Sequence, residues 1–262
     1  VGTLLLQRAG KGTIAVAGGG CSEATAFLAR TAGLDATHTT AYTTFICGLA
    51  SDGVFAKLDT LYVFNTQTAA ASLLNLISSS FPMTNVGALG FTVDHGYAAT
   101  TSTQFLTTTW AENAGGNHWI ETSSSMGFWS RTATATNVPS WGDNGGNSRL
   151  FSRFAGDLAI YNADDLNFDA TQAASTDGSG LFAGSRTGTT TQIYRNGATL
   201  GAAGTVSFSQ AVSATTWQTG TNADTGTSMA MAFSGGFLTA TDMSNLNSRY
   251  SAWNTTISGG NP

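Results

Sequence analysis

From about residue 80 to residue 235, short runs of aromatic and β-branched residues alternate with clusters of Gly, Asn, Asp and Ser. Each run is long enough for a strand and too short for a typical helix. Several short strands at this spacing predict an all-β sandwich or barrel. The runs that we expect to form strands are residues 104–110, 117–122, 126–131, 149–154, 157–161, 181–185, 191–195, 206–208, 215–218 and 229–234.

The alternation of side chains along these runs predicts which residues face the core. The dipeptide Asn196-Gly197 stands between two of the runs, and this pair favours a two-residue type I′ hairpin. The expected core residues of the sandwich are Phe105, Phe128, Leu150, Ile160, Phe182, Ile193, Tyr194, Phe208 and Phe233.

Helical patterns flank the β region. Residues 22–58 have the apolar spacing of helices, with Asp35 placed to cap the second of them. Near the end of the chain, Thr239 and Asp242 resemble a capping box, in which Asp replaces the usual Glu. We therefore expect an N-terminal arm at residues 1–20, a small helical unit at 21–80, and an antiparallel β-sandwich at 81–262 that closes with a helix.

The charge of the chain excludes some partners. Charged residues make up only 10% of the sequence, against about 25% in an average domain. The net charge is −5 and no run of Lys or Arg occurs, so the electrostatic footprint of a nucleic-acid-binding protein is missing. No apolar run approaches the roughly 20 residues that a membrane helix needs. We expect neither nucleic acid nor a membrane as a partner.

The chain has two cysteines, Cys21 and Cys47. They allow one disulfide, but Cys47 falls on the buried face of a predicted helix. We therefore favour two reduced thiols, which agrees with synthesis in a cytoplasm.

The acidic residues and histidines do not form a recognisable catalytic set. A glycosidase needs two carboxylates on either side of the sugar, about 5–5.5 or 6.5–9.5 Å apart. None of the three Glu has an Asp at alternating spacing, and Asp164, Asp165 and Asp169 fall in a predicted loop. The histidines, which have no His or Cys at metal-ligand spacing, are His38, His95 and His118. We expect no enzymatic activity.

Most of the six tryptophans fall on predicted strands, where they fill a core. Trp141 differs, because Gly, Asp and Asn surround it in an expected turn. We expect Trp141, Asp143 and Asn144 to form a ligand-binding site, with the indole stacking on a sugar ring. Asp143, Asn144 and Asp224 also offer oxygen ligands for calcium. Asx turns explain the same residues without a metal, and we expect no cofactor.

Three segments carry a resemblance to known domains. Residues 181–187 (Leu-Phe-Ala-Gly-Ser-Arg-Thr) and 192–197 (Gln-Ile-Tyr-Arg-Asn-Gly) look like the central hairpin of laminin-G/concanavalin-like jelly-roll domains. Residues 229–236 (Met-Ala-Met-Ala-Phe-Ser-Gly-Gly), followed by a helix, are similar to the closing strand and helix of those domains. The resemblance implies a concanavalin/laminin-G-like jelly roll.

The N-terminal part resembles a module that precedes such a sandwich in structural proteins of alphaproteobacterial phages and prophages. The segment 91–97 (Phe-Thr-Val-Asp-His-Gly-Tyr) matches the start of the sandwich in that family. The resemblance covers roughly residues 22–255. The segments of the module that it matches are residues 27–30, 33–38, 41–42, 48–49, 52–54, 57–59 and 61–64.

This resemblance implies a non-enzymatic structural protein on the exterior of a virion, made in the cytoplasm of a bacterial host. It would be a decoration, spike or fibre subunit that displays a lectin-like domain and associates with other virion subunits or with itself. The alternative function is a carbohydrate-binding adhesion module for glycans of the host surface. A polysaccharide depolymerase is the third.

The apolar residues of the arm indicate how it would attach. An exposed apolar segment gains nothing in water, and a short strand can add to the sheet edge of another chain. The residues that we expect to be buried against a neighbouring subunit are Leu4, Leu5, Leu6 and Ile14.

Overall fold

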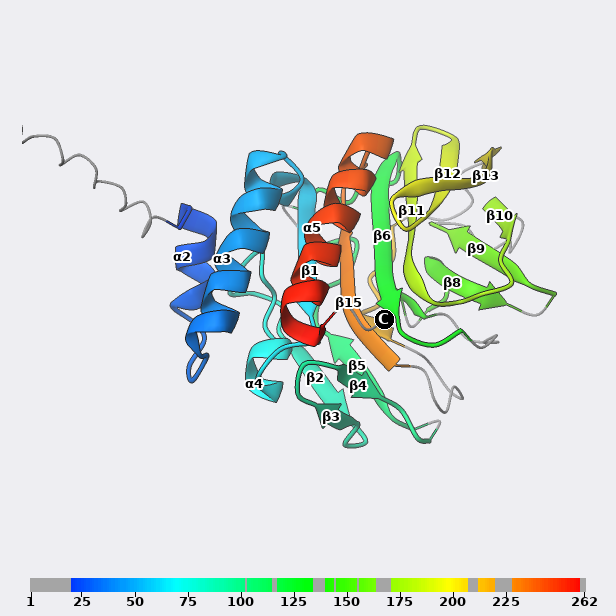
Figure 1. The fold of residues 1–262 in the computed structure, drawn as a ribbon. Coiled ribbons are helices and arrows are strands. Elements are labelled where there is room, and N and C mark those ends of the chain that lie inside the picture. The colour runs from blue at the N-terminus through cyan, green and yellow to red at the C-terminus, as the bar shows by residue number, and fades with distance from the viewer. Residues whose placement is uncertain are drawn as a thin grey trace, which may run out of the picture.

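The fold is described from a computed structural model of the chain. The residues that it describes are 20–101, 103–114, 117–133, 140–143, 145–154, 156–163, 171–206, 212–219 and 228–259. They form three layers, in which helices cover one face of a first antiparallel sheet and a second antiparallel sheet covers its other face (Figure 1). None of the helices in these residues is long and apolar enough to span a membrane.

The first sheet, sheet A, has the strand order β13-β12-β11-β6-β15-β4-β3, and β1 also pairs with β15. Its long central strands pair in regular antiparallel register, with Phe128 opposite Phe182 and opposite Ala232. The strands of sheet A are β1 (Leu58–Val63), β3 (Gly90–Thr92), β4 (Gly96–Ala98), β6 (Ser123–Ser130), β11 (Gly180–Thr187), β12 (Thr190–Arg195), β13 (Ala198–Thr205) and β15 (Ser228–Gly235).

The second sheet, sheet B, has the order β10-β9-β8-β7-β14-β5-β2. Its strands are shorter, and the two at its centre have three residues each. They are β2 (Met83–Val86), β5 (Phe105–Thr108), β7 (Trp141–Asp143), β8 (Arg149–Phe154), β9 (Leu158–Asn162), β10 (Thr171–Ala174) and β14 (Trp217–Thr219).

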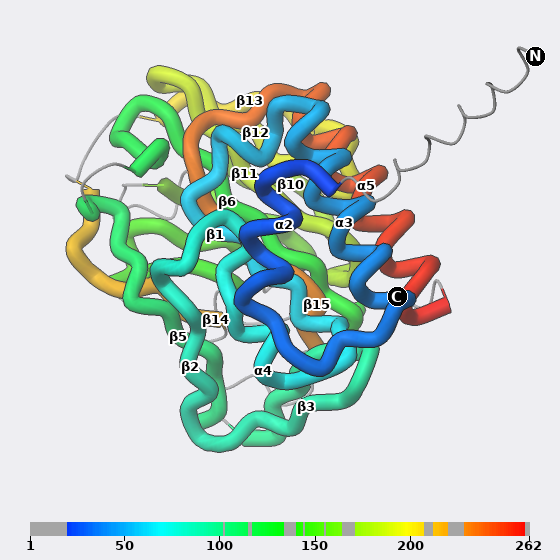
Figure 2. Tube along the Cα trace, turned by 90° about the vertical axis from the view of Figure 1, so that its left-hand side faces the viewer, coloured from blue at the N-terminus to red at the C-terminus, as the bar shows by residue number. Residues whose placement is uncertain are grey.

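The helices lie on the outer face of sheet A. These are α2 (Ser22–Leu28), α3 (Ala36–Ser51) and α5 (Ala240–Ser258), while α4 (Ala69–Ser72) and the 3₁₀ turn η1 (Phe55–Lys57) are short connections. Figure 2 shows α2 outermost, in front of α3 and β1. The first and last parts of the chain therefore build one layer together, because α3 packs against α5.

Sheet A is buried on both faces, and each face contributes to a separate core. Along β6, Met126 and Phe128 point between the sheets, whereas Trp129 faces the helices. In β12, Ile193 and Tyr194 divide in the same way. A sheet covered on both faces has strands that are apolar at nearly every position, which explains why the run 229–234 has so few polar residues.

The helix boundaries follow the expected capping. Asp35 accepts a hydrogen bond from the backbone N–H of His38 at the start of α3. Thr239 and Asp242 form the capping box of α5, and Gly259 ends that helix in the left-handed conformation. These caps satisfy backbone groups that a helix end would otherwise leave unpaired.

Most of the predicted strands and core residues are confirmed. Asn196 and Gly197 have φ of 50° and 81°, as a type I′ turn requires, and they join β12 to β13. Phe105 is only half-buried, because Leu106 takes the position that faces the core. Residues 117–122 form no strand and contribute a single bridge. Phe208 lies outside the described residues. The seven that are buried as predicted are Phe128, Leu150, Ile160, Phe182, Ile193, Tyr194 and Phe233.

The prediction of two reduced thiols is wrong, because Cys21 and Cys47 form a disulfide. Cys21 immediately precedes α2, and Cys47 lies in the fourth turn of α3. The two helices pack together, which brings the Cα atoms within 5.5 Å, a normal separation for a disulfide. Cys47 therefore lies on the face of α3 that packs against α2, where its side chain meets Cys21.

Two ion pairs join α5 to the segment that leads from the end of α3 to β1. Arg249 of α5 donates to both carboxylate oxygens of Asp52, at 2.9 and 3.0 Å, and Lys57 donates to Asp242 at 2.7 Å. The hydrogen bond from Arg249 lowers the pKa of Asp52. Burial alone would raise the pKa of Asp242, but hydrogen bonds from Lys57 and Thr239 outweigh burial and lower that pKa as well.

We expect these pairs to make the fold sensitive to acid. A carboxylate with a depressed folded-state pKa stabilises the fold above its unfolded pKa of about 3.9, and this contribution disappears as the pH falls through the folded-state value. Asp52→Asn should therefore lower the free energy of unfolding by about 0.5 kcal/mol at pH 7 and by less near pH 2.5. Urea unfolding of both proteins at the two pH values measures this. An equal difference at both would contradict the prediction.

Candidate functional site

The predicted ligand-binding site at Trp141 is not formed. The side chain of Trp141 is 0% exposed, and its Nε1 donates to the carbonyl oxygen of Phe233 at 2.9 Å. Asp143 is 4% exposed, and its Oδ1 accepts the backbone N–H of Ser148 at 2.9 Å, which closes the turn after β7. Asn144 lies outside the described residues. The prediction is wrong for Trp141 because residue 141 begins β7, a central strand of sheet B, and the Trp141 side chain points between the sheets.

Two of the three histidines lie beside carboxylates. His38 is buried and lies between two carboxylates, with 2.8 Å from Nδ1 to Asp35 and 2.8 Å from Nε2 to Asp94. His118 lies 2.9 Å from Asp59, which also accepts backbone N–H groups of residues 118 and 119. Within the described ranges, no three His, Cys, Asp or Glu residues are grouped as a metal site would require. The other acidic residues that we considered, outside those ranges, are Asp164, Asp165, Asp169 and Asp224.

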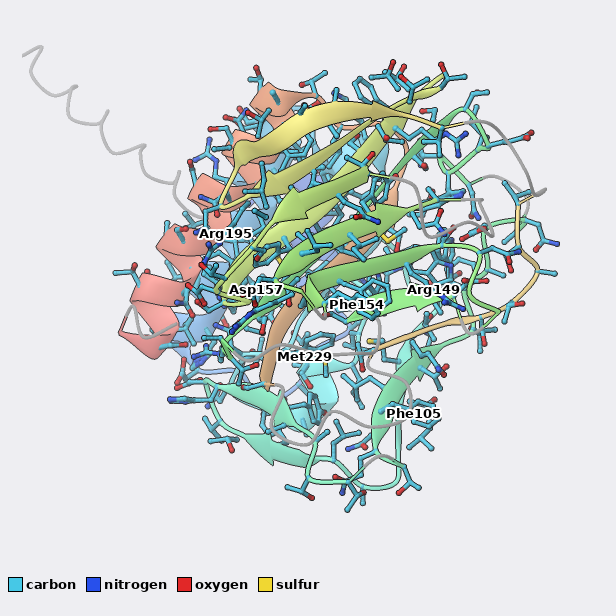
Figure 3. The ribbon with its side chains drawn as sticks, turned by 90° about the vertical axis from the view of Figure 1, so that its right-hand side faces the viewer. Phe105, Arg149, Phe154, Asp157, Arg195 and Met229 are labelled. Atoms are coloured by element: carbon cyan, nitrogen blue, oxygen red, sulfur yellow. A yellow bond between two sulfur atoms is a disulfide. The ribbon has the colours of Figure 1, made fainter. Side chains whose placement is uncertain are left out.

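A polar pocket of about 360 Å³ lies where the β10–β11 connection and the β12–β13 turn meet α5. We call it the α5 pocket. Figure 3 shows one of its residues, Arg195, at the end of β12 beside α5. The residues that line the pocket are Trp129, Asp177, Ser179, Gly180, Arg195, Asn196, Asn247 and Ser251.

The turn between β12 and β13 forms one wall of the α5 pocket. A Cβ at Gly197 would lie 2.9 Å from the Cβ of Asn247 and 3.0 Å from the Cα of Ser244, so only glycine lets the turn approach α5 this closely. Asn196 closes the turn on β11, where its Oδ1 accepts the backbone N–H of Leu181 at 3.0 Å. The hairpin predicted from the sequence is thus what places Arg195 against the helix.

The floor of the α5 pocket comes from β6 and α5. Trp129 stands opposite Leu181 in sheet A and packs on Tyr250 with ring centroids 4.9 Å apart. It is 8% exposed. Asn247 and Ser251 lie one helical turn apart, so their side chains share the face of α5 that borders the pocket.

The one ion pair among the lining residues joins Arg195 to Asp177. Nη2 of Arg195 lies 2.6 Å from the carboxylate of Asp177 and 3.2 Å from the carbonyl oxygen of Ser179. The guanidinium carbon lies 5.3 Å from the ring centroid of Phe182. The backbone N–H of Ser179 lowers the pKa of Asp177, and the hydroxyl of Ser179 and Arg195 add to this against the opposing effect of burial. The pair is therefore charged on both sides and carries no net charge.

Three polar atoms of the α5 pocket are buried without a hydrogen bond. They are Nε1 of Trp129, Nε of Arg195 and Oδ1 of Asn247, and none of them has a partner among the residues that the structure describes. A buried donor or acceptor that stays unpaired costs about 1–3 kcal/mol, so such groups are rare unless water or a ligand satisfies them. Each of the three atoms has less than 1 Å² of accessible surface, so they lie behind the pocket wall and a ligand in the pocket would not contact them.

A second pocket, of about 280 Å³, contains two carboxylates, Glu112 and Glu121. Glu112 is buried and its Oε2 accepts the backbone N–H of Ser213 at 2.7 Å, which gives it a structural task. Ile120, also in the lining, is one of the two large apolar residues recorded as exposed in the described part of the chain. Neither glutamate was predicted to have a catalytic role. The lining of this pocket contains fewer polar side chains than the lining of the α5 pocket.

Sequence reasoning did not identify the α5 pocket. Trp129 was expected in the core, and Arg195-Asn196 was recognised only as the start of a hairpin. Asp177 and Asn247 carried no pattern at all. The one available signal was a charged residue immediately before the Asn-Gly turn, since a turn next to a strand end places that residue at the border of a sheet.

Known structures with a similar fold include glycan-binding and glycan-cleaving proteins. The ligand binding domain of botulinum neurotoxin serotype D, solved with N-acetylneuraminic acid, has a TM-score of 0.56 at 12% identity, over 77% of this chain and 52% of that chain. For the receptor binding domain of botulinum neurotoxin type G the values are 0.55, 14%, 74% and 52%. For a sialidase of Trypanosoma rangeli they are 0.51, 7%, 80% and 39%.

This chain spans about half the length of the neurotoxin domains. At such low identities the similarity shows the fold alone, and it confirms the predicted mainly-β antiparallel sandwich. No protein-family model matches the chain, and no curated protein matches it either.

Proposed function

We propose that this chain is a non-enzymatic glycan-binding module and that the α5 pocket holds the sugar. The observation that carries the proposal is the polar lining of this pocket, to which Arg195, Asn196 and Asn247 contribute. The β-sandwich fold supports it, because one domain of similar fold was solved with a bound sialic acid. The volume of the pocket, about 360 Å³, falls in the roughly 300–1,000 Å³ range of small-ligand sites.

The chemistry of the lining suits a sugar. Each sugar hydroxyl donates one hydrogen bond and accepts up to two, so adjacent hydroxyls can pair with donors and acceptors at once. Trp129 offers no broad stacking face, since it is only 8% exposed. Such a site would hold a terminal sugar residue by hydrogen bonds, with modest affinity for one ring.

An absence of catalysis fits the same residues. Asp177 is the one carboxylate lining the α5 pocket, and it already accepts hydrogen bonds from Arg195 and from the backbone N–H of Ser179. Most glycoside hydrolases use a pair of carboxylates. Among the described residues, the second pocket offers such a pair in Glu112 and Glu121, but Glu112 accepts the backbone N–H of Ser213.

The setting that we propose for the module is the exterior of a virion, as a decoration, spike or fibre subunit. This part of the proposal rests on the resemblance to phage structural proteins. The anchoring residues Leu4, Leu5, Leu6 and Ile14 lie outside the described residues, so burial against another virion subunit stays a prediction. A glycan-binding module on a virion would serve attachment to the host surface.

We expect Asn247→Ala and Arg195→Ala each to weaken glycan binding about tenfold, because each removes a polar side chain that lines the pocket and can hydrogen-bond to a sugar. A glycan array identifies a ligand for the wild-type chain, and isothermal titration calorimetry then measures the affinity of each variant. Asn245→Ala is the matched control, since residue 245 lies on the same helix and outside the pocket lining. Binding that survives both pocket variants unchanged would refute this site.

A further inference from the structure

A groove of about 180 Å³ lies between α3 and α5, on the side of the helical layer that faces away from sheet A. We call it the α3/α5 groove. The exposed residues of its lining are Thr40, Thr44, Ala252 and Thr256, which present methyl groups and short hydroxyls. The one charged residue recorded in the lining, Arg249, is already paired through its guanidinium. Such a groove suits short aliphatic side chains better than a charged ligand.

The N-terminal arm is fixed to a helix that forms one wall of this groove. Gly20, the last residue of the arm, packs on α3, since a Cβ at this position would lie 3.4 Å from Cγ2 of Thr43. The next residue, Cys21, is bonded to Cys47 of the same helix. Thr44, which lines the groove, lies between these two contacts in the sequence of α3, and α3 itself lies between α2 and α5 (Figure 1). The disulfide therefore holds the base of the arm on α3.

The sequence of the arm complements the body of the chain. Ile14 and Val16 alternate with alanines, so both would point to the same side of an extended segment. Arg8 and Lys11 are the only charged residues of the arm and give it a charge of +2. The rest of the chain has the other 8 of the 10 basic residues and all 15 acidic ones, a net charge of −7. Opposite charge favours docking of the arm onto the body of a chain of this kind.

The reach of the arm favours the groove of a second copy over its own. The residues of α3 that line the groove, 40–45, extend over about 8 Å of helix. In an extended arm Ile14 and Val16 would stand about 14–20 Å from Gly20, beyond that length. Residues 17–19, which stand next to the arm's own groove, carry at most a methyl group. An arm that continues in extended form thus presents its first bulky apolar side chains to a neighbouring molecule.

We propose that the α3/α5 groove receives the arm of a second copy of this chain, with Ile14 and Val16 packed on its exposed rim. A twofold axis close to Gly20 lets each copy supply one arm and one groove, so the contact is made twice in a closed dimer. The Cys21–Cys47 disulfide fixes the starting point of each arm. This inference is independent of the proposed glycan site, because no residue lines both the α3/α5 groove and the α5 pocket.

Sedimentation velocity of the full chain over a range of concentrations tests the self-association. The wild-type chain should form a dimer. Ala252→Lys should weaken the dimer at least about tenfold, because a charge on the rim would have to be desolvated under the arm, and the double variant Ile14→Ser/Val16→Ser should weaken it to a similar extent. Thr255→Lys is the matched control, since residue 255 is exposed on the same helix and outside the lining. Circular dichroism verifies that each variant folds.

Chemical cross-linking identifies the copy that supplies the arm. A chain with Ile14→Cys is mixed with a chain with Ala252→Cys and treated with a bis-maleimide, which should join the two chains; Cys21 and Cys47 are bonded to each other and do not react. If the double variant Ile14→Cys/Ala252→Cys instead cross-links within one chain and the mixture gives no pair, each groove holds its own arm and the inference is wrong. A wild-type chain that stays monomeric at every concentration would overturn it as well, and so would a dimer that Ala252→Lys leaves unchanged.

Discussion

Replacing Trp141 by alanine is expected to lower the free energy of unfolding by about 3–5 kcal/mol, the usual cost of removing a large buried aromatic side chain. Trp141 is fully buried and packs edge-on against Trp217, with ring centroids 5.3 Å apart. Its Nε1 also donates to the carbonyl oxygen of Phe233, which belongs to the opposite sheet. The alanine variant therefore loses packing volume and a hydrogen bond that joins the two sheets.

Urea unfolding followed by circular dichroism measures this effect. Trp141→Phe is the matched control, because it keeps an aromatic ring in the core and removes only the hydrogen bond and part of the volume. We expect it to cost about 1–3 kcal/mol, since it leaves the buried Phe233 carbonyl short of one partner. A loss below about 1 kcal/mol in Trp141→Ala would mean that the side chain is exposed, as the sequence had suggested.

The misassignment of Trp141 has a physical explanation. The Gly, Asp and Asn residues around it are typical of turns, and a turn does begin at Asp143. However, β7 has three residues, too few to show an alternating pattern. Its place between β8 and β14 depends on partners that are far away in the sequence. Long strands such as β6 and β11 could be predicted because they contain enough residues to show which side chains are apolar on each face.

Local signals performed well wherever one segment carries the whole interaction. The capping residues Asp35, Thr239 and Asp242 lie within three positions of the backbone groups that they bind. The turn at Asn196-Gly197 needs only its own backbone conformation. These features could be predicted because no distant residue changes their geometry.

The α5 pocket could not be predicted in the same way. Trp129, Asp177, Arg195 and Asn247 come from four separate elements, and sheet register and helix docking bring them together. What marks the site is a pocket with a mostly polar lining, a property of the assembled fold. A single sequence contains the residues but gives no indication that they meet.

The disulfide was misjudged for a related reason. Burial of Cys47 was read as burial in an apolar core, where a free thiol behaves as a small hydrophobic group. Cys47 is in fact partly buried and packs beside the core of the helical layer, with Cys21 as its neighbour. Helix periodicity gives the face of α3 on which Cys47 lies but not what lies opposite to it.

Removal of this disulfide is expected to lower the free energy of unfolding by about 3.5 kcal/mol. The bond joins residues 26 positions apart, and cross-linking a loop of this length removes conformational entropy mainly from the unfolded chain. For a chain of this size each kcal/mol corresponds to roughly 2–4 °C, so the melting temperature should fall by roughly 7–14 °C. The double variant Cys21→Ala/Cys47→Ala avoids leaving a single reactive thiol.

Scanning calorimetry with and without reductant measures the effect in both proteins. Reductant should lower the melting temperature of the wild-type chain to about that of the double variant and should not change the double variant itself. Equal melting temperatures for the oxidised wild type and the double variant would contradict the prediction. Glycan affinity below the melting transition should be the same in both, because neither cysteine lines the α5 pocket. The disulfide thus sets the melting temperature through the unfolded chain, whereas the α5 pocket sets the glycan affinity of the native protein.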